Sequence, residues 1–208
     1  MNATSMTILT VSIAAGSAIA GFEAPNAHTW PMEHVMISMT NNQIDAHTND
    51  GAMVDLLRFA GESYSGDASV LDDSYYSDQY GWVADGFIDL SAGEFMWISF
   101  VSGTDGLDVY EGGRRTMSDT HTYDAIQGTD GSDNAWMWSG VMTHNWYSVQ
   151  EAGLYEATYE VYVGDADGNA LTAYTSDTVT LNFNAVPAPS SLALLGMGGV
   201  VATRRRRA

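Results

Sequence analysis

Histidines are the side chains in this sequence best suited to bind a transition metal. His34, His47, His121 and His144 lie in a long acidic stretch, and the chain has no cysteine. Neutral imidazole and carboxylate are therefore the ligands that this stretch offers to zinc or a similar ion. No H-x-H or H-x₃-H spacing is present, so the alternative is that each histidine is an exposed or singly hydrogen-bonded residue.

A second cation motif lies near the C-terminal end of the acidic stretch. Asp165, Asp167 and Asn169 place oxygen atoms at alternate positions, as the start of a calcium loop does. The twelfth position of that loop is Ser176 rather than an acidic residue, so the pattern favours a hairpin turn over a calcium site. The segment from 128 to 133 is interpreted in the same way.

Catalytic motifs are missing from the sequence. No G-x-S-x-G elbow is present to fix a serine nucleophile, and no carboxylate pair is set apart from the other acidic residues. We therefore predict a protein that is not an enzyme. An alternative binding function is a carbohydrate-binding module in which tryptophans stack on sugars. The four tryptophans that could do so, or could equally be core residues, are Trp82, Trp97, Trp136 and Trp138.

Charge is distributed very unevenly along the 208 residues. All 26 acidic residues but only three of the seven basic ones lie between 21 and 185, which gives this stretch 23 net negative charges. Such a domain repels nucleic acid and anionic membrane surfaces and attracts cations. The 45% apolar content is ample for a packed core.

The elements that must position these side chains are predicted to be strands. Residues 154–163 alternate between apolar and polar side chains, and so do residues 177–184. Asp-Gly pairs between the strands form turns. The predicted strands are 33–39, 43–47, 53–59, 81–90, 94–101, 106–110, 135–142, 144–149, 154–163 and 177–184.

This succession of strands and turns, without an amphipathic helix between 30 and 185, predicts an all-β fold. We expect an antiparallel β-sandwich, with a jelly roll as the alternative. The polar, tyrosine-rich segment 61–80 is predicted to be a long loop.

Both ends of the chain are predicted to be targeting segments. At the N-terminus, an apolar run precedes Ala18 and Ala20, whose A-x-A relation predicts signal-peptidase cleavage after Ala20. At the C-terminus, the uncharged segment 190–203 would span about 21 Å as a helix, short of the roughly 30 Å hydrocarbon core. The arginines that follow it predict a stop at the cytoplasmic side of a membrane.

The C-terminal segment resembles the PEP-CTERM sorting signal of Gram-negative bacteria. The likeness rests on a proline motif, an apolar helix and a basic cluster in that order, although Ala188 stands where the family name expects Glu. The resemblance implies recognition and processing by an exosortase, after transient membrane insertion. The residues that carry it are Val186, Pro187, Pro189, Arg204, Arg205, Arg206 and Arg207.

Two internal segments, 33–50 and 143–183, are similar to the choice-of-anchor M domains, also met as actinobacterial surface-anchored repeats. Only His144 precedes Trp146, where that family often has paired histidines. The resemblance implies a secreted β domain, in some members encoded near zinc-uptake systems. On this basis we predict a zinc site formed by His34, His47 and His144, with a nearby carboxylate as a further ligand.

The sequence thus predicts three parts: a signal peptide (1–20), an acidic β-sandwich domain (21–185) and a sorting signal (186–208) that includes a short apolar helix. The expected product is an exported, non-enzymatic protein of the cell envelope, outer surface or extracellular matrix of a Gram-negative bacterium. Its expected partners are signal peptidase and exosortase during processing and an extracellular polysaccharide afterwards, with no nucleic acid. The alternative function is a carbohydrate-binding module of an exopolysaccharide matrix.

Overall fold

The structure is a computed structural model that describes residues 32–59, 61–114 and 120–187. The predicted signal peptide and apolar C-terminal helix lie outside these residues. Within the described ranges, no helix is long and apolar enough to cross a membrane.

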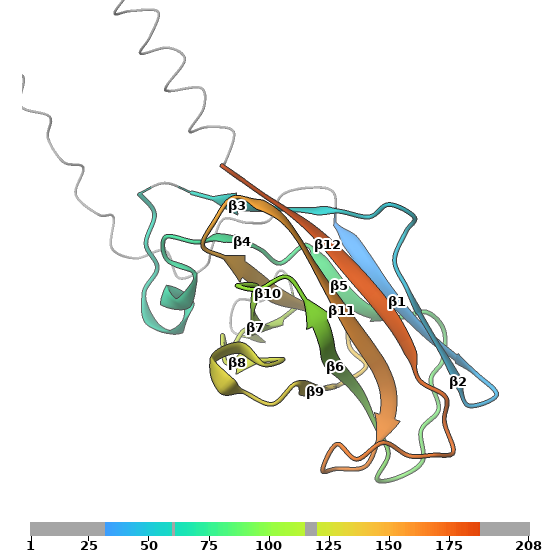
Figure 1. The fold of residues 1–208 in the computed structure, drawn as a ribbon. Helices are drawn as coiled ribbons and strands as arrows, with labels where there is room; N and C mark the ends of the chain where they lie inside the picture. Colours follow the sequence, from blue (N-terminus) through green and yellow to red (C-terminus); the bar gives the residue numbers. More distant parts are fainter. Residues whose placement is uncertain (1–31, 60, 115–119, 188–208) are drawn as a thin grey trace, which may run out of the picture.

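The described residues form an all-β fold, as predicted (Figure 1). Each of the ten predicted strands overlaps an observed one. Strands β4 and β8 and the two short 3₁₀-helices η1 and η3 were not predicted. The elements are β1 (Glu33–Thr40), β2 (Gln43–His47), β3 (Val54–Arg58), η1 (Gly66–Leu71), β4 (Tyr75–Ser77), β5 (Tyr80–Ala84), β6 (Phe95–Gly103), β7 (Asp108–Gly113), β8 (Ala125–Ile126), η3 (Thr129–Gly131), β9 (Ala135–Trp138), β10 (Thr143–Val149), β11 (Gly153–Gly164) and β12 (Asp177–Pro187).

The strands belong to one mixed sheet, in the order β2-β1-β5-β10-β4-β3-β12-β11-β6-β9, with β7 pairing with β10 and β8 with β7. The prediction of a purely antiparallel arrangement is wrong. β1 pairs with β5 in parallel, and β12 pairs with β3 in parallel. Alternation of apolar and polar residues reports which face of a strand is buried, and it is the same in both kinds of pairing.

One main core contains side chains from strands that are far apart in the sheet order. Val35 of β1 and Trp82 of β5 are fully buried in it together with Tyr159 of β11 and Phe183 of β12. The rings of Trp82 and Tyr159 meet edge to face, with their centroids 5.7 Å apart. Aromatic pairs of this kind add stabilisation beyond the area that they bury.

A second, smaller group of buried side chains lies outside the main core, and we call it the aromatic cluster. It corrects the prediction that 61–80 is a long loop, because four of its seven residues come from this segment, which contains η1 and β4. Apolar and tyrosine side chains in this segment remove surface from water although they follow no strand or helix period. The cluster consists of Tyr64, Ala68, Leu71, Tyr76, Tyr110, Tyr123 and Trp146.

Turn chemistry explains several of the strand boundaries. Asn41 and Asn42, at φ of 53° and 63°, close the two-residue β1–β2 hairpin, as a type I′ turn requires. Five Asp-Gly pairs occur in the sequence, and their glycines (Gly51, Gly86, Gly106, Gly131 and Gly168) all have positive φ, so the predicted turns are confirmed.

Two predicted strands are shorter than expected, and this shapes the surface. β5 ends at Ala84 rather than at 90, and β9 ends at Trp138 rather than at 142. Gly86 and Gly140 both adopt positive φ, which takes the chain out of the extended conformation. The two connections that result, 85–94 and 139–142, line the largest hollows described below.

Candidate functional site

Two of the three predicted zinc ligands flank the same residue of the sheet. His34 of β1 and His144 of β10 both pair with Gly81 of β5, so all three residues lie on one face. We call this the histidine row. Two strand spacings separate the Cα atoms of the two histidines, or roughly 9–10 Å.

The imidazole of His144 lies over Gly81. A Cβ atom at position 81 would be 2.6 Å from Cε1 and 2.7 Å from Nε2 of that ring. Nδ1 of His144 donates to the carbonyl oxygen of Asp78 at 2.7 Å, because a carbonyl can only accept. The neutral ring therefore carries its proton on Nδ1. His144 is 1% exposed and is held as part of the packing.

His47 lies one strand beyond His34. It pairs with Met36, two residues along β1, and so faces the same side of the sheet as the histidine row. Its exposed Nδ1 is 3.1 Å from the carboxylate of Asp45. As the side chains stand in the described residues, no three histidine or acidic groups are arranged to hold a metal ion.

His121, the remaining described histidine, joins the aromatic cluster. Its Nδ1 accepts a hydrogen bond from Nε1 of Trp146 at 2.9 Å, because an indole N–H can only donate. Its Nε2 is 3.2 Å from the carbonyl oxygen of Arg114 and is the donor there. Both bonds require the neutral ring. His121 therefore links Trp146 of β10 to Arg114, which directly follows β7.

The tryptophans considered for sugar stacking are mostly core residues. Trp82 and Trp138 are buried to 0% and 2% exposure, and Trp136 to 8%. Trp97 is half-buried, and its Nε1 donates to the carbonyl oxygen of Asp165 at 3.0 Å. No open platform formed by the ring faces of Trp136 and Trp138 is present at the described surface, since both residues are buried members of the main core.

The Asp165 turn is closed on itself. The carboxylate of Asp165 accepts hydrogen bonds from the backbone N–H groups of Asp167 and Asn169 and from the side-chain amide of Asn169. These bonds, led by the one from the Asn169 side chain, hold the pKa of Asp165 below its ordinary value. The arrangement is that of an Asx-type turn, as the sequence favoured.

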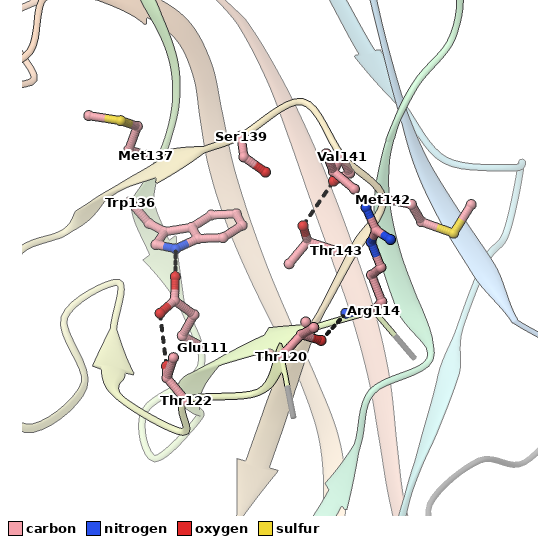
Figure 2. Close-up of a pocket in the computed structure, with 12 residues that line it drawn as sticks. Glu111, Arg114, Thr120, Thr122, Trp136, Met137, Ser139, Val141, Met142 and Thr143 are labelled. Carbon is pink, nitrogen blue, oxygen red and sulfur yellow. Dashed lines mark hydrogen bonds between the residues drawn. The ribbon is translucent and has the colours of Figure 1, made fainter. Parts of the chain in front are cut away.

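A cavity of about 370 Å³ lies between β7 and β9, and we call it the β7–β9 pocket (Figure 2). It is formed by the end of β7, a facing pair of threonines, and β9 with the connection that leads into β10. Its lining residues are Glu111, Gly112, Gly113, Arg114, Thr120, Thr122, Trp136, Met137, Ser139, Val141, Met142 and Thr143.

Two adjacent glycines bring the pocket walls together. A Cβ atom at Gly112 would collide with the carbonyl oxygen of His144, and one at Gly113 would collide with Thr120. The absence of both side chains lets β7 approach β10 and the threonine segment. The backbone N–H of Gly112 then donates to the side-chain oxygen of Asn145 at 3.1 Å.

Glu111 is fixed at one end of the pocket. Its Oε1 accepts from Nε1 of Trp136 at 2.8 Å, and its Oε2 accepts from the hydroxyl of Thr122 at 2.8 Å (Figure 2). An ionised carboxylate offers about four lone-pair positions, so each oxygen can accept a further bond. The carboxylate is thus held in one orientation and can still accept hydrogen bonds from a ligand.

Arg114 lies at the opposite end of the pocket, beside Val141 and Met142, with Ser139 and Thr143 between it and the Glu111 end (Figure 2). Its backbone N–H donates to the hydroxyl of Thr120 at 2.8 Å, which fixes where the side chain departs from β7. The pocket therefore has a carboxylate at one end, a guanidinium at the other and apolar side chains along its walls.

A neighbouring hollow of about 630 Å³ lies on the other side of the 139–142 connection. It shares Met137 and Ser139 with the β7–β9 pocket, and Phe87 in its lining is 85% exposed. Glu94 in its wall accepts a 2.6 Å hydrogen bond from the hydroxyl of Tyr174. That bond is the main reason why the pKa of Glu94 lies below its ordinary value.

The targeting residues fall mostly outside the described ranges: Ala18, Ala20, Pro189 and Arg204 to Arg207. Val186 and Pro187 are described, and they form the end of β12. They pair in parallel with Leu57 and Arg58 of β3. The first two residues of the predicted sorting motif therefore continue the last strand of the fold.

The β7–β9 pocket could not be predicted from the sequence. Glu111, Thr122 and Ser139 follow no motif, and a search by ligand type favoured the histidines instead. One feature of the sequence did point to this region. The adjacent glycines Gly112 and Gly113 directly precede Arg114, one of the few basic residues of the acidic stretch. The comparisons add no further guidance, since neither a family model nor a curated protein matches the chain.

Proposed function

We propose that this protein is an exported, non-enzymatic component of the bacterial surface or extracellular matrix, sorted by an exosortase. The observation that carries the proposal is the order of the three C-terminal parts in the sequence: proline motif, apolar segment and four arginines. The end of β12 at Pro187 supports it, because the fold and the motif meet there.

We also propose a two-layer β-sandwich as the architecture of the domain. The β1, β5 and β10 portion and the β6, β11 and β12 portion contribute facing side chains to one core. Tyr80 of β5 and Phe183 of β12, for example, meet edge to face with ring centroids 5.3 Å apart. Opposed faces joined by such contacts are typical of two packed layers.

Intact mass of the protein recovered outside the cell tests the sorting proposal. The product should begin near Gly21 and lack Arg204 to Arg207. Replacing the four arginines with serine should cause mislocalisation while the thermal unfolding midpoint stays unchanged. A secreted product that retains both ends of the chain would exclude exosortase sorting.

Zinc binding is the second candidate function, and the specific observation that favours it is the alignment of His34 and His144 across Gly81. We propose that these two histidines, with His47 and a nearby carboxylate, bind zinc after a local rearrangement of side chains. Binding needs neutral imidazole, so affinity should fall as the pH drops through about 6.5.

Thermal unfolding with and without zinc tests this second candidate. Zinc at a hundred times its dissociation constant should stabilise the fold by about 2.7 kcal/mol. His34→Gln should abolish the effect, and calcium should not reproduce it. An unchanged unfolding midpoint in millimolar zinc would exclude the site.

A further inference from the structure

The β7–β9 pocket combines three features that the histidine row lacks: space, a fixed acceptor and a cation. Its volume of about 370 Å³ falls at the lower end of the roughly 300–1,000 Å³ range of small-molecule sites. This size suits a short saccharide better than a folded partner.

The Glu111 end is built to accept hydrogen bonds from a ligand. Trp136 and Thr122 each donate to a different oxygen of the carboxylate and hold it in one orientation. A pre-oriented acceptor loses little conformational entropy when a ligand binds. Hydroxyl groups on adjacent carbons of a sugar are donors of the kind that such a carboxylate can engage.

The Arg114 end supplies positive charge in a strongly acidic domain. Of the two described arginines, Arg58 and Arg114, it is Arg114 that lines this pocket. At physiological ionic strength the Debye length is about 8 Å, so a ligand group at Arg114 experiences chiefly its local surroundings. An arginine fork is well suited to a carboxylate.

The walls between these ends are apolar. Met137, Val141 and Met142 are 38%, 43% and 41% exposed, although large apolar side chains are usually buried. Methionine adapts its shape to irregular partners. These side chains, with the edge of Trp136, offer a surface for the C–H face of a sugar ring.

We propose that the β7–β9 pocket binds a uronic-acid unit of an extracellular polysaccharide. The carboxylate of the sugar pairs with Arg114, its hydroxyls donate to Glu111, and its C–H face contacts Trp136 and Met137. Repulsion between the two carboxylates sets the orientation, because it keeps the acidic group of the sugar away from Glu111. The proposal deepens the matrix function and rests on it for the source of the ligand.

Isothermal titration calorimetry on the full chain tests the proposal with two probes, tri-galacturonate and the corresponding neutral trisaccharide. Tri-galacturonate should bind, and the neutral trisaccharide should bind at least tenfold more weakly. Arg114→Gln should weaken tri-galacturonate binding at least tenfold. Arg58→Gln is the matched control, since it removes the same charge elsewhere, and it should change the affinity less than twofold.

Three results would overturn the proposal: no binding of either trisaccharide, equal losses in the Arg114→Gln and Arg58→Gln variants, or tri-glutamate binding as tightly as tri-galacturonate. The last result would indicate a peptide site. Unfolding midpoints of both variants confirm that each is folded. The intact-mass measurement of sorting is independent, so failure of the sugar site and failure of exosortase sorting can be told apart.

Discussion

The histidine row and the β7–β9 pocket lie on the two sides of the first residues of β10, where His144 pairs with Gly81 of β5 and with Gly113 of β7, and they differ in the space around their side chains. In the row, His144 is 1% exposed and its ring fills the space above Gly81. In the pocket, Glu111 and Arg114 face a cavity of about 370 Å³. The row has the side chains of a metal site without a hollow, whereas the pocket has a hollow lined by groups of complementary charge.

Residues of a ligand-binding type can bind directly only where the fold leaves room for a ligand, so the side chains of the histidine row would first have to rearrange. Glycine has opposite consequences in the two regions. Gly81 makes room that a protein side chain then occupies, while Gly112 and Gly113 let strands approach so that a cavity remains beside them.

The largest effect is expected at Gly81. Gly81→Ala should lower the free energy of unfolding by about 1–3 kcal/mol, because the new methyl group would overlap the buried His144 ring. Chemical denaturation measures the change. In a His144→Ala background the same substitution should cost at least 1 kcal/mol less, by the logic of a double-mutant cycle. Additive costs would show that the ring does not lie over Gly81.

A smaller effect is expected at the anchored end of the pocket. Glu111→Ala removes the acceptor of the Trp136 indole N–H, a donor on an 8% exposed residue. Loss of such an acceptor should cost about 1–2 kcal/mol and change the tryptophan fluorescence. Glu151→Ala, at an exposed glutamate, is the control and should stay within about 0.5 kcal/mol of the parent. Equal effects of the two variants would mean that the carboxylate is not anchored.

A pH effect should mark the hollow next to the pocket. The pKa of Glu94 is lowered, chiefly by the hydrogen bond from Tyr174, so this carboxylate contributes stability above its unfolded pKa of about 4.5. That contribution is lost as the pH falls through the lower folded pKa. In Tyr174→Phe the pKa of Glu94 should rise, as carboxyl resonances in an NMR titration report. An unchanged pKa of Glu94 in Tyr174→Phe would show that the hydrogen bond from Tyr174 does not lower it.

The smallest effect is expected at the exposed end of the histidine region. His47→Ala should change the free energy of unfolding by no more than about 0.5 kcal/mol, because the pair that it forms with Asp45 is exposed on both sides. The contrast with His144 makes this variant informative. Destabilisation by more than 1 kcal/mol would show that His47 is part of the packing.

Sequence reasoning predicted the strands well because apolar alternation is local. The period-2 pattern of 154–163 lies within the observed β11 (Gly153–Gly164). The parallel pairing of β12 with β3 could not be predicted, since it joins residues about 130 positions apart, such as Phe183 and Val54. The aromatic cluster was missed for a related reason: Tyr64 and Leu71 become buried through distant partners, including Trp146, and follow no period of their own.

The candidate sites show the same limit. His144 was predicted to be a zinc ligand because imidazole binds zinc. Its burial and its hydrogen bond to the carbonyl oxygen of Asp78 depend on the register of β10 with β5, which the sequence does not reveal. In the sequence nothing distinguishes Glu111 from the other acidic residues. The fold distinguishes it, because it places Trp136 and Thr122 within hydrogen-bond distance of its carboxylate. Concavity arises from the arrangement of strands, which a single sequence does not display.

NMR mapping with tri-galacturonate tests most directly whether the β7–β9 pocket binds the uronic-acid unit. The indole N–H of Trp136 and the guanidinium N–H of Arg114 provide probes inside the pocket, and the amide of Gly81 and the ring of His144 report on the row. Binding in the pocket should give saturable shifts at Trp136 and Arg114 that are clearly larger than those at Gly81 and the His144 ring, since His144 pairs with Gly113 of the pocket wall. Shifts confined to the histidine row, or an absence of shifts at both places, would contradict it.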